Sequence, residues 1–192
     1  YNLLLDMGLL ETGEFDYRYF SGIVLLVVLV TGIITLYTSK NEKHNIKTLK
    51  DKLALLVALI IPYVLSLLLS NLSSLIFPIY ISAVLITAYF GFRTGIVMSF
   101  LLTFLILPLS GFDSKYLLVT ILGCVVASLF TMNISKRNNY ALIIISTAMT
   151  CFLASITFNL LIKSTIKDTF TDSGFAVLNG SISVIFALGI MP

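Results

Sequence analysis

The feature that most limits the fold is an uncharged run of 40 residues, from position 53 to position 92. As an α-helix this run would be about 60 Å long, because each residue adds about 1.5 Å. The hydrocarbon layer of a membrane is about 30 Å thick, so the run is long enough to cross it twice. Its one polar cluster near the middle is residues 70–74, where we place the break. The run therefore predicts two membrane spans.

Composition extends this interpretation to the whole chain. Of the 192 residues, 58% are hydrophobic and only 11% are charged, whereas soluble domains have about 25% charged residues. The net charge of +3 is small, and no basic patch carries interleaved aromatic side chains, so we expect the lipid bilayer and no nucleic acid as a partner. Cys124 and Cys151 lie in apolar runs and predict buried free thiols.

The predicted fold class is all-α: a polytopic membrane protein with seven transmembrane helices in a bundle. The expected spans are about 19–38, 53–70, 75–91, 95–109, 116–132, 140–162 and 175–191. These make residues 19–192 one transmembrane domain, in which residues 163–174 are expected to form a longer polar loop. Residues 1–18 are expected to be the end of an extracellular domain with a juxtamembrane helix. We expect the chain to be a segment of a longer protein.

Basic residues predict the orientation of the spans. Short loops rich in Lys and Arg stay on the cytoplasmic side of a membrane. With seven spans, eight of the twelve basic residues share one side with only two of the nine acidic ones. These topology determinants are Lys40, Lys43, Lys47, Lys50, Lys52, Arg93, Lys136 and Arg137. The pattern predicts an outside N-terminus and a cytoplasmic C-terminus.

No Asp, Glu, Lys, Arg or His lies inside the predicted spans, and we assign no catalytic, cofactor-binding or metal-binding residue there. Proton relays and ion paths in membranes usually use such residues. Small residues instead recur at helical spacing, which is typical of close helix packing in lipid. They are Gly123 and Ala127 in the fifth span, and Ala176, Gly180, Ser183 and Ala187 in the seventh. The alternative is a sliding surface in a signalling motion.

Two asparagines lie near the polar loop that precedes the last span. Asn159 is close to the end of the sixth predicted span, and Asn179 is near the start of the seventh. Amide side chains in membrane helices commonly form hydrogen bonds between helices, and we expect that use here. Binding of a ligand is the alternative.

The two ends of the chain carry a family resemblance. The opening YNLLLDMGLL, with Asp6-Met7-Gly8-Leu9-Leu10, and the closing LNGSISVIFALGIMP resemble bacterial seven-transmembrane receptors with an intracellular HD hydrolase domain, of the PgpH-type cyclic-di-AMP phosphodiesterases. The resemblance implies an extracellular domain upstream and a cytoplasmic HD domain with two divalent metal ions downstream. It also implies the bacterial cytoplasmic membrane as the location. A second copy of the chain is a candidate partner.

The functional hypothesis is a sensor module that anchors and regulates a cyclic-di-AMP phosphodiesterase lying after the C-terminus. On this hypothesis the fragment has no enzymatic activity, because the catalytic His and Asp residues of an HD domain are not in it. One alternative is a small-solute transporter or the substrate-binding membrane component of one. The other is a structural membrane scaffold.

Overall fold

The computed structural model describes residues 17–40, 49–132 and 139–191. Within these ranges the chain forms seven α-helices and no strands, which confirms the predicted all-α helical bundle. The helices are α2 (Tyr17–Lys40), α3 (Leu49–Leu69), α4 (Tyr80–Phe90), α5 (Phe92–Ile106), α6 (Ser114–Thr131), α7 (Asn139–Ile162) and α8 (Ile166–Ile190). Two short 3-10 turns, η1 (Ser74–Ile76) and η2 (Leu107–Ser110), precede α4 and follow α5.

Six of these helices or helix–turn units are long and apolar enough to cross a membrane, and α4 is the short one. Its 11 residues make a helix about 16 Å long, half the thickness of the hydrocarbon layer. The predicted span over residues 75–91 corresponds to η1 and α4 together, a short apolar unit over Ser74–Phe90 that is not one regular α-helix. The chain there first forms η1 and an extended link at Phe77, and only then the helix. Pro78 lies in the link, where its missing N–H costs no helical hydrogen bond.

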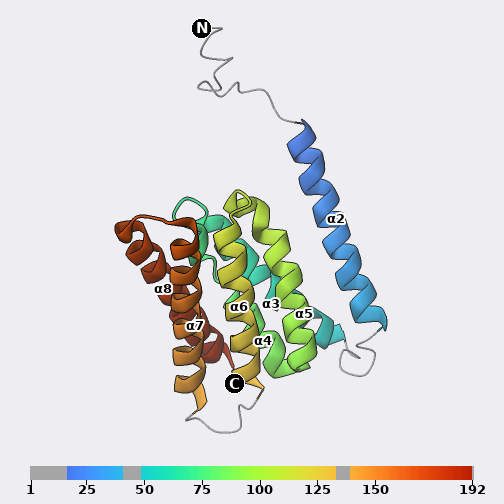
Figure 1. Ribbon diagram of the computed structural model, residues 1–192. Coiled ribbons are helices and arrows are strands. Elements are labelled where there is room, and N and C mark those ends of the chain that lie inside the picture. The colour runs from blue at the N-terminus through green and yellow to red at the C-terminus, as the bar shows by residue number, and fades with distance from the viewer. Residues whose placement is uncertain (1–16, 41–48, 133–138, 192) are drawn as a thin grey trace.

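Helix α4 is the centre of the bundle. It packs against α3, α5, α6 and α8, while α7 pairs with α6 and α8. In Figure 1 the helices run up and down beside one another, and α2 stands at the edge of the bundle with α5 as its main neighbour. The core is therefore built by the last six helices.

Basic residues gather at the end of the bundle where α2 ends and α3 and α5 begin. Lys40 closes α2, Lys50 and Lys52 lie in the first turn of α3, and Arg93 lies in the first turn of α5. We call this the basic end. The N-terminal segment 1–16 and four of the predicted topology determinants, Lys43, Lys47, Lys136 and Arg137, lie outside the described residues.

The predicted polar loop over residues 163–174 is wrong, because α8 begins at Ile166. Helix α7 ends with Lys163 in a left-handed conformation (φ 58°), and the Ser164 N–H donates to the Asn159 carbonyl. This hydrogen bond is typical of a helix that stops abruptly. The Thr165 hydroxyl oxygen then accepts from the Asp168 N–H and caps the start of α8. The polar residues at positions 163–168, which resemble a loop in the sequence, end α7 and cap the start of α8.

A single glycine joins α4 to α5. Gly91 has φ 89°, a conformation that a residue with a side chain rarely adopts. Its N–H donates to the Thr87 carbonyl, which closes α4, and its own carbonyl accepts the Gly95 N–H, which opens α5. Helix α5 thus begins at Phe92, three residues before the predicted start of the fourth span.

Candidate functional site

The final helix, α8, faces the bundle along one continuous stripe. Its buried residues are Ser173, Ala176, Asn179, Gly180, Ser183, Val184 and Ala187. The stripe includes all four small residues singled out in the last predicted span. Helix α8 therefore contacts the bundle from near its first turn to near its last.

Helix α8 passes close to α7 at Gly180. A Cβ atom at this position would lie 3.2 Å from the Cα of Ala148 and 3.2 Å from the sulfur of Cys151. These distances are tighter than ordinary van der Waals contact. The small residue therefore lets the two helix backbones meet, as in other close crossings in lipid.

Gly123 and Ala127 of α6 face the central helix and the core. An added Cβ at Gly123 would lie 2.4 Å from a ring carbon of Tyr80, so the tyrosine ring occupies the space that a side chain would need. Ala127 is fully buried. The Tyr80 hydroxyl donates to the Val119 carbonyl (3.4 Å), and the Cys151 thiol donates to the Tyr80 oxygen (3.2 Å). Tyr80 therefore joins α4 to α6 and α7.

Asn179 binds the break in the chain that precedes α4. Its amide nitrogen donates to the Leu75 carbonyl (2.8 Å) and to the Phe77 carbonyl (2.9 Å). Its amide oxygen accepts from the Ser183 hydroxyl (2.7 Å), so the side chain is held in this orientation. Non-helical backbone at membrane depth must find protein partners, because lipid offers none. Asn179 supplies them, and it couples α8 to the segment that leads into the central helix.

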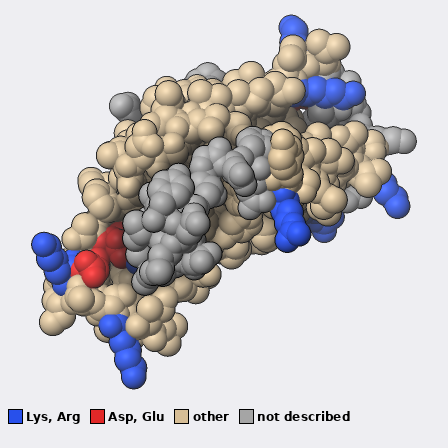
Figure 2. All heavy atoms as spheres, turned by 90° about the horizontal axis from the view of Figure 1, so that it is seen from above, with Lys and Arg blue, Asp and Glu red and all other residues tan. Residues whose placement is uncertain are grey.

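A carboxylate network ties α8 to its neighbours at the end opposite the basic one. Asp172 accepts from the Lys115 ammonium of α6 (2.5 Å) and from the Asn159 amide of α7 (3.3 Å). Asn159 in turn accepts from the Ser164 hydroxyl. The Lys115 and Asp172 side chains are 20% and 22% exposed, so water reaches the pair only partly. In Figure 2, which looks onto this end, the acidic side chains in view form one small patch beside basic ones.

A second carboxylate at the same end, Asp113, holds α6 to η1. One oxygen caps α6 by accepting the Lys115 N–H, and the other accepts the Ser74 hydroxyl (2.8 Å). The two carboxylates thus connect η1, α6, α7 and α8 at this end of the bundle.

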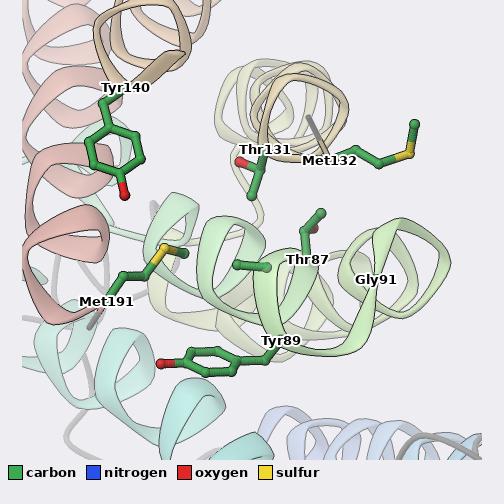
Figure 3. Close-up of a pocket in the computed structure, with 8 residues that line it drawn as sticks. Thr87, Tyr89, Gly91, Thr131, Met132, Tyr140 and Met191 are labelled. Atoms are coloured by element: carbon green, nitrogen blue, oxygen red, sulfur yellow. The ribbon is translucent and has the colours of Figure 1, made fainter. Parts of the chain in front are cut away.

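At the basic end, α8 finishes beside a cavity of about 490 Å³. The cavity is lined by Thr87, Ala88, Tyr89, Gly91, Thr131, Met132, Tyr140 and Met191. Figure 3 shows the Tyr140 hydroxyl pointing toward Met191, the residue that follows α8, with Thr131 facing them from α6. The lining residues in the described ranges are uncharged, and they leave space beside the end of α8.

The predicted use of Asn159 and Asn179 in hydrogen bonds between elements is confirmed, and both cysteines are buried free thiols as expected. The sequence reasoning missed the Lys115–Asp172 pair and the role of Tyr80. A signal for the pair existed, because the two opposite charges flank spans on the same predicted side. To predict the Lys115–Asp172 pair, one must know that Asp172 lies in α8, whereas we expected residues 163–174 to form a loop.

The described part of the chain has no group of three or more His, Cys, Asp or Glu residues that could hold a metal ion. The family resemblance implies two divalent ions in the HD domain downstream, and that stays a prediction. The contacts of α8 connect one end of the bundle to the other through hydrogen bonds and close packing.

The family model described as 7TM receptor with intracellular HD hydrolase matches residues 17–192, the transmembrane region. A search of curated proteins found no match, and neither did a search of solved structures. The match covers nearly the whole chain, and it agrees with a bundle of seven helices in the described residues. The chain belongs to the family of seven-transmembrane receptors with an intracellular HD hydrolase.

Proposed function

We propose that this bundle is a sensor module that anchors and regulates a cytoplasmic cyclic-di-AMP phosphodiesterase, and that α8 is the helix that carries the signal. The family name supports a receptor linked to an HD hydrolase. The cyclic-di-AMP substrate, the outer domain and the two metal ions of the hydrolase come from the resemblance of the chain ends.

The observation that carries the proposal is the pair of hydrogen bonds from Asn179 to the Leu75 and Phe77 carbonyls. Through them a shift of α8 must also move or release the link before α4, and α4 contacts four other helices. We expect a helix held in this way to occupy discrete positions rather than a continuous range. That is the property needed for a two-state switch whose equilibrium an outer domain can bias.

The rest of the path follows α8 from end to end. Asp172 joins its first part to α6 and α7, where a force from an outer domain would arrive. Gly180 is the close crossing with α7. Met191 leaves the bundle at the cavity that it lines with Tyr140 and Thr131, on the side of the proposed hydrolase. The distribution of Lys and Arg supports a cytoplasmic location for this basic end, in a bacterial cytoplasmic membrane.

The experiment that tests the proposal is Asn179→Leu in the full-length protein. Leucine has nearly the same size but cannot donate, so the Leu75 and Phe77 carbonyls lose their partner. We expect the rate of cyclic-di-AMP hydrolysis in membranes to change by about fivefold or more, the lower range of allosteric coupling. The matched control is Leu178→Ile, since Leu178 is 55% exposed and lies beside Asn179 in the chain. A rate equal to the wild-type rate for both variants would contradict the coupling role of Asn179.

A further inference from the structure

A groove separates α2 from α3 near the basic end. Its volume is about 680 Å³, and both helices that form its walls are long and apolar enough to span a membrane. Leu55, Leu56, Leu59 and Ile60 of α3 form an apolar wall, and Lys52 lies at the end of the groove nearest the first turn of α3. Figure 1 shows α2 standing at the edge of the bundle, so the groove lies where lipid surrounds the protein.

The α2 wall carries four hydroxyl groups, those of Thr31, Thr35, Thr38 and Ser39, and the last three donate within their own helix. Thr35 donates to the Thr31 carbonyl (2.8 Å), and Thr38 donates to the Ile34 carbonyl (2.8 Å). Ser39 donates to the Leu36 carbonyl (3.1 Å). Because these donors bond within their own helix, the middle of the groove suits an apolar occupant.

The charge at the mouth of the groove is positive. Lys52 belongs to it directly, and Lys40 and Lys50 lie at the same end of the bundle. Asp51 is the acidic residue of this end in the described ranges, so the three lysines leave an excess of positive charge there. An occupant with a negative head and an apolar tail would complement both parts of the groove.

We propose that this groove binds one anionic phospholipid of the surrounding membrane, with its phosphate at Lys52 and an acyl chain along the leucine wall of α3. Basic pockets between membrane helices recognise lipid head groups in this way, by charge at the membrane surface and apolar contact below it. The proposal does not depend on the signalling role of α8, because α8 forms no part of the groove.

The test uses fluorescence, because the chain contains no tryptophan. Val57→Trp places one fluorophore on α3 beside the groove without filling it, since Val57 is 49% exposed and does not line it. The protein is reconstituted in phosphatidylcholine nanodiscs containing a small fixed fraction of a lipid with brominated acyl chains. We expect brominated phosphatidylglycerol to quench about twofold more strongly than brominated phosphatidylcholine at the same fraction.

Three controls separate a site from general attraction to a basic surface. Lys52→Gln should abolish the excess quenching, and Lys52→Arg should keep it. A fluorophore at Ile145→Trp, exposed on α7 at a similar depth, should respond in the same way with and without Lys52→Gln. Equal quenching of Val57→Trp by the two lipids would overturn the proposal, and so would an excess that survives Lys52→Gln.

Discussion

Helices α2 and α4 are both strongly apolar, but they lie in opposite surroundings. Val30 is the buried residue of the 24-residue helix α2. In the 11-residue helix α4, nine residues are buried. The longer helix, which has the length to cross a membrane alone, is at the edge, and the one too short to cross is at the centre.

The difference between the two helices lies in their neighbours. Lipid is as apolar as leucine, so apolar content does not drive one helix inside another in a membrane. Helix α4 is flanked by two glycines that make room for it: Gly95 of α5 faces Thr87, and Gly123 of α6 faces Tyr80. A Cβ added at Gly22 or Gly32 of α2 would meet nothing within 4 Å. Close approach to its neighbours therefore distinguishes the central helix from α2.

The largest expected effect concerns the side of the membrane on which each loop lies. If α4 returns the chain to the basic end, reporters fused after Lys47 and after Arg137 should both be active only in the cytoplasm. A reporter fused after Lys167 should be active only outside. Alkaline phosphatase and green fluorescent protein fusions measure the two sides. A common side for the fusions at Lys47 and Lys167 would contradict the seven-helix arrangement.

The next largest effect concerns the glycine next to the central helix. Gly123→Ala places a methyl group against the Tyr80 ring, and overpacking of this kind costs about 1–3 kcal/mol of the free energy of unfolding. The matched change in α2 is Gly32→Ala, which meets open space. It should stabilise the protein by up to about 1 kcal/mol, because alanine favours a helix. Reversible unfolding in mixed micelles measures the change in the free energy of unfolding for both variants. Equal changes would show that α4 is no more tightly packed than α2.

A smaller effect is expected from the ion pair at the end opposite the basic one. Asp172→Asn leaves Lys115 without its counter-charge and should lower the free energy of unfolding by about 1 kcal/mol, since the pair is partly open to water. The contrasting change is Thr35→Val in α2, where the hydroxyl bonds only within its own helix. It should change stability by less than about 0.5 kcal/mol. Asp172→Asn acting as weakly as Thr35→Val would show that the network does not hold α8.

How far the sequence predicts this molecule differs from one region to another. The uncharged run from residue 53 to residue 92 predicts two elements with a break, because length and charge are local properties. The short length of α4 does not follow from that run, because the link before it is stabilised by Asn179, about a hundred residues away. The start of α8 was missed for a local reason. Thr165 and Asp168 are as typical of a helix cap as of a loop.

The candidate site divides in the same way. The helical spacing of small residues places Ala176, Gly180, Ser183 and Ala187 on one face, and the structure buries that face. The partner of Asp172 is 57 positions away in the chain. No periodic pattern in the sequence identifies such a partner, because the pairing depends on how the ends of α6, α7 and α8 lie in the folded bundle.

The measurement that tests the central claim most directly is the hydrolysis rate of the full-length protein with Gly180→Leu. The larger side chain must push α8 away from Ala148 and Cys151, so the rate in membranes should change by about fivefold or more while expression stays near normal. Gly180→Ala should change it in the same direction but less. Ile185→Leu, on the exposed side of α8, should leave it unchanged. If Gly180→Leu leaves the rate of the proposed hydrolase at its wild-type value, α8 is a passive tether and the signal does not pass through it.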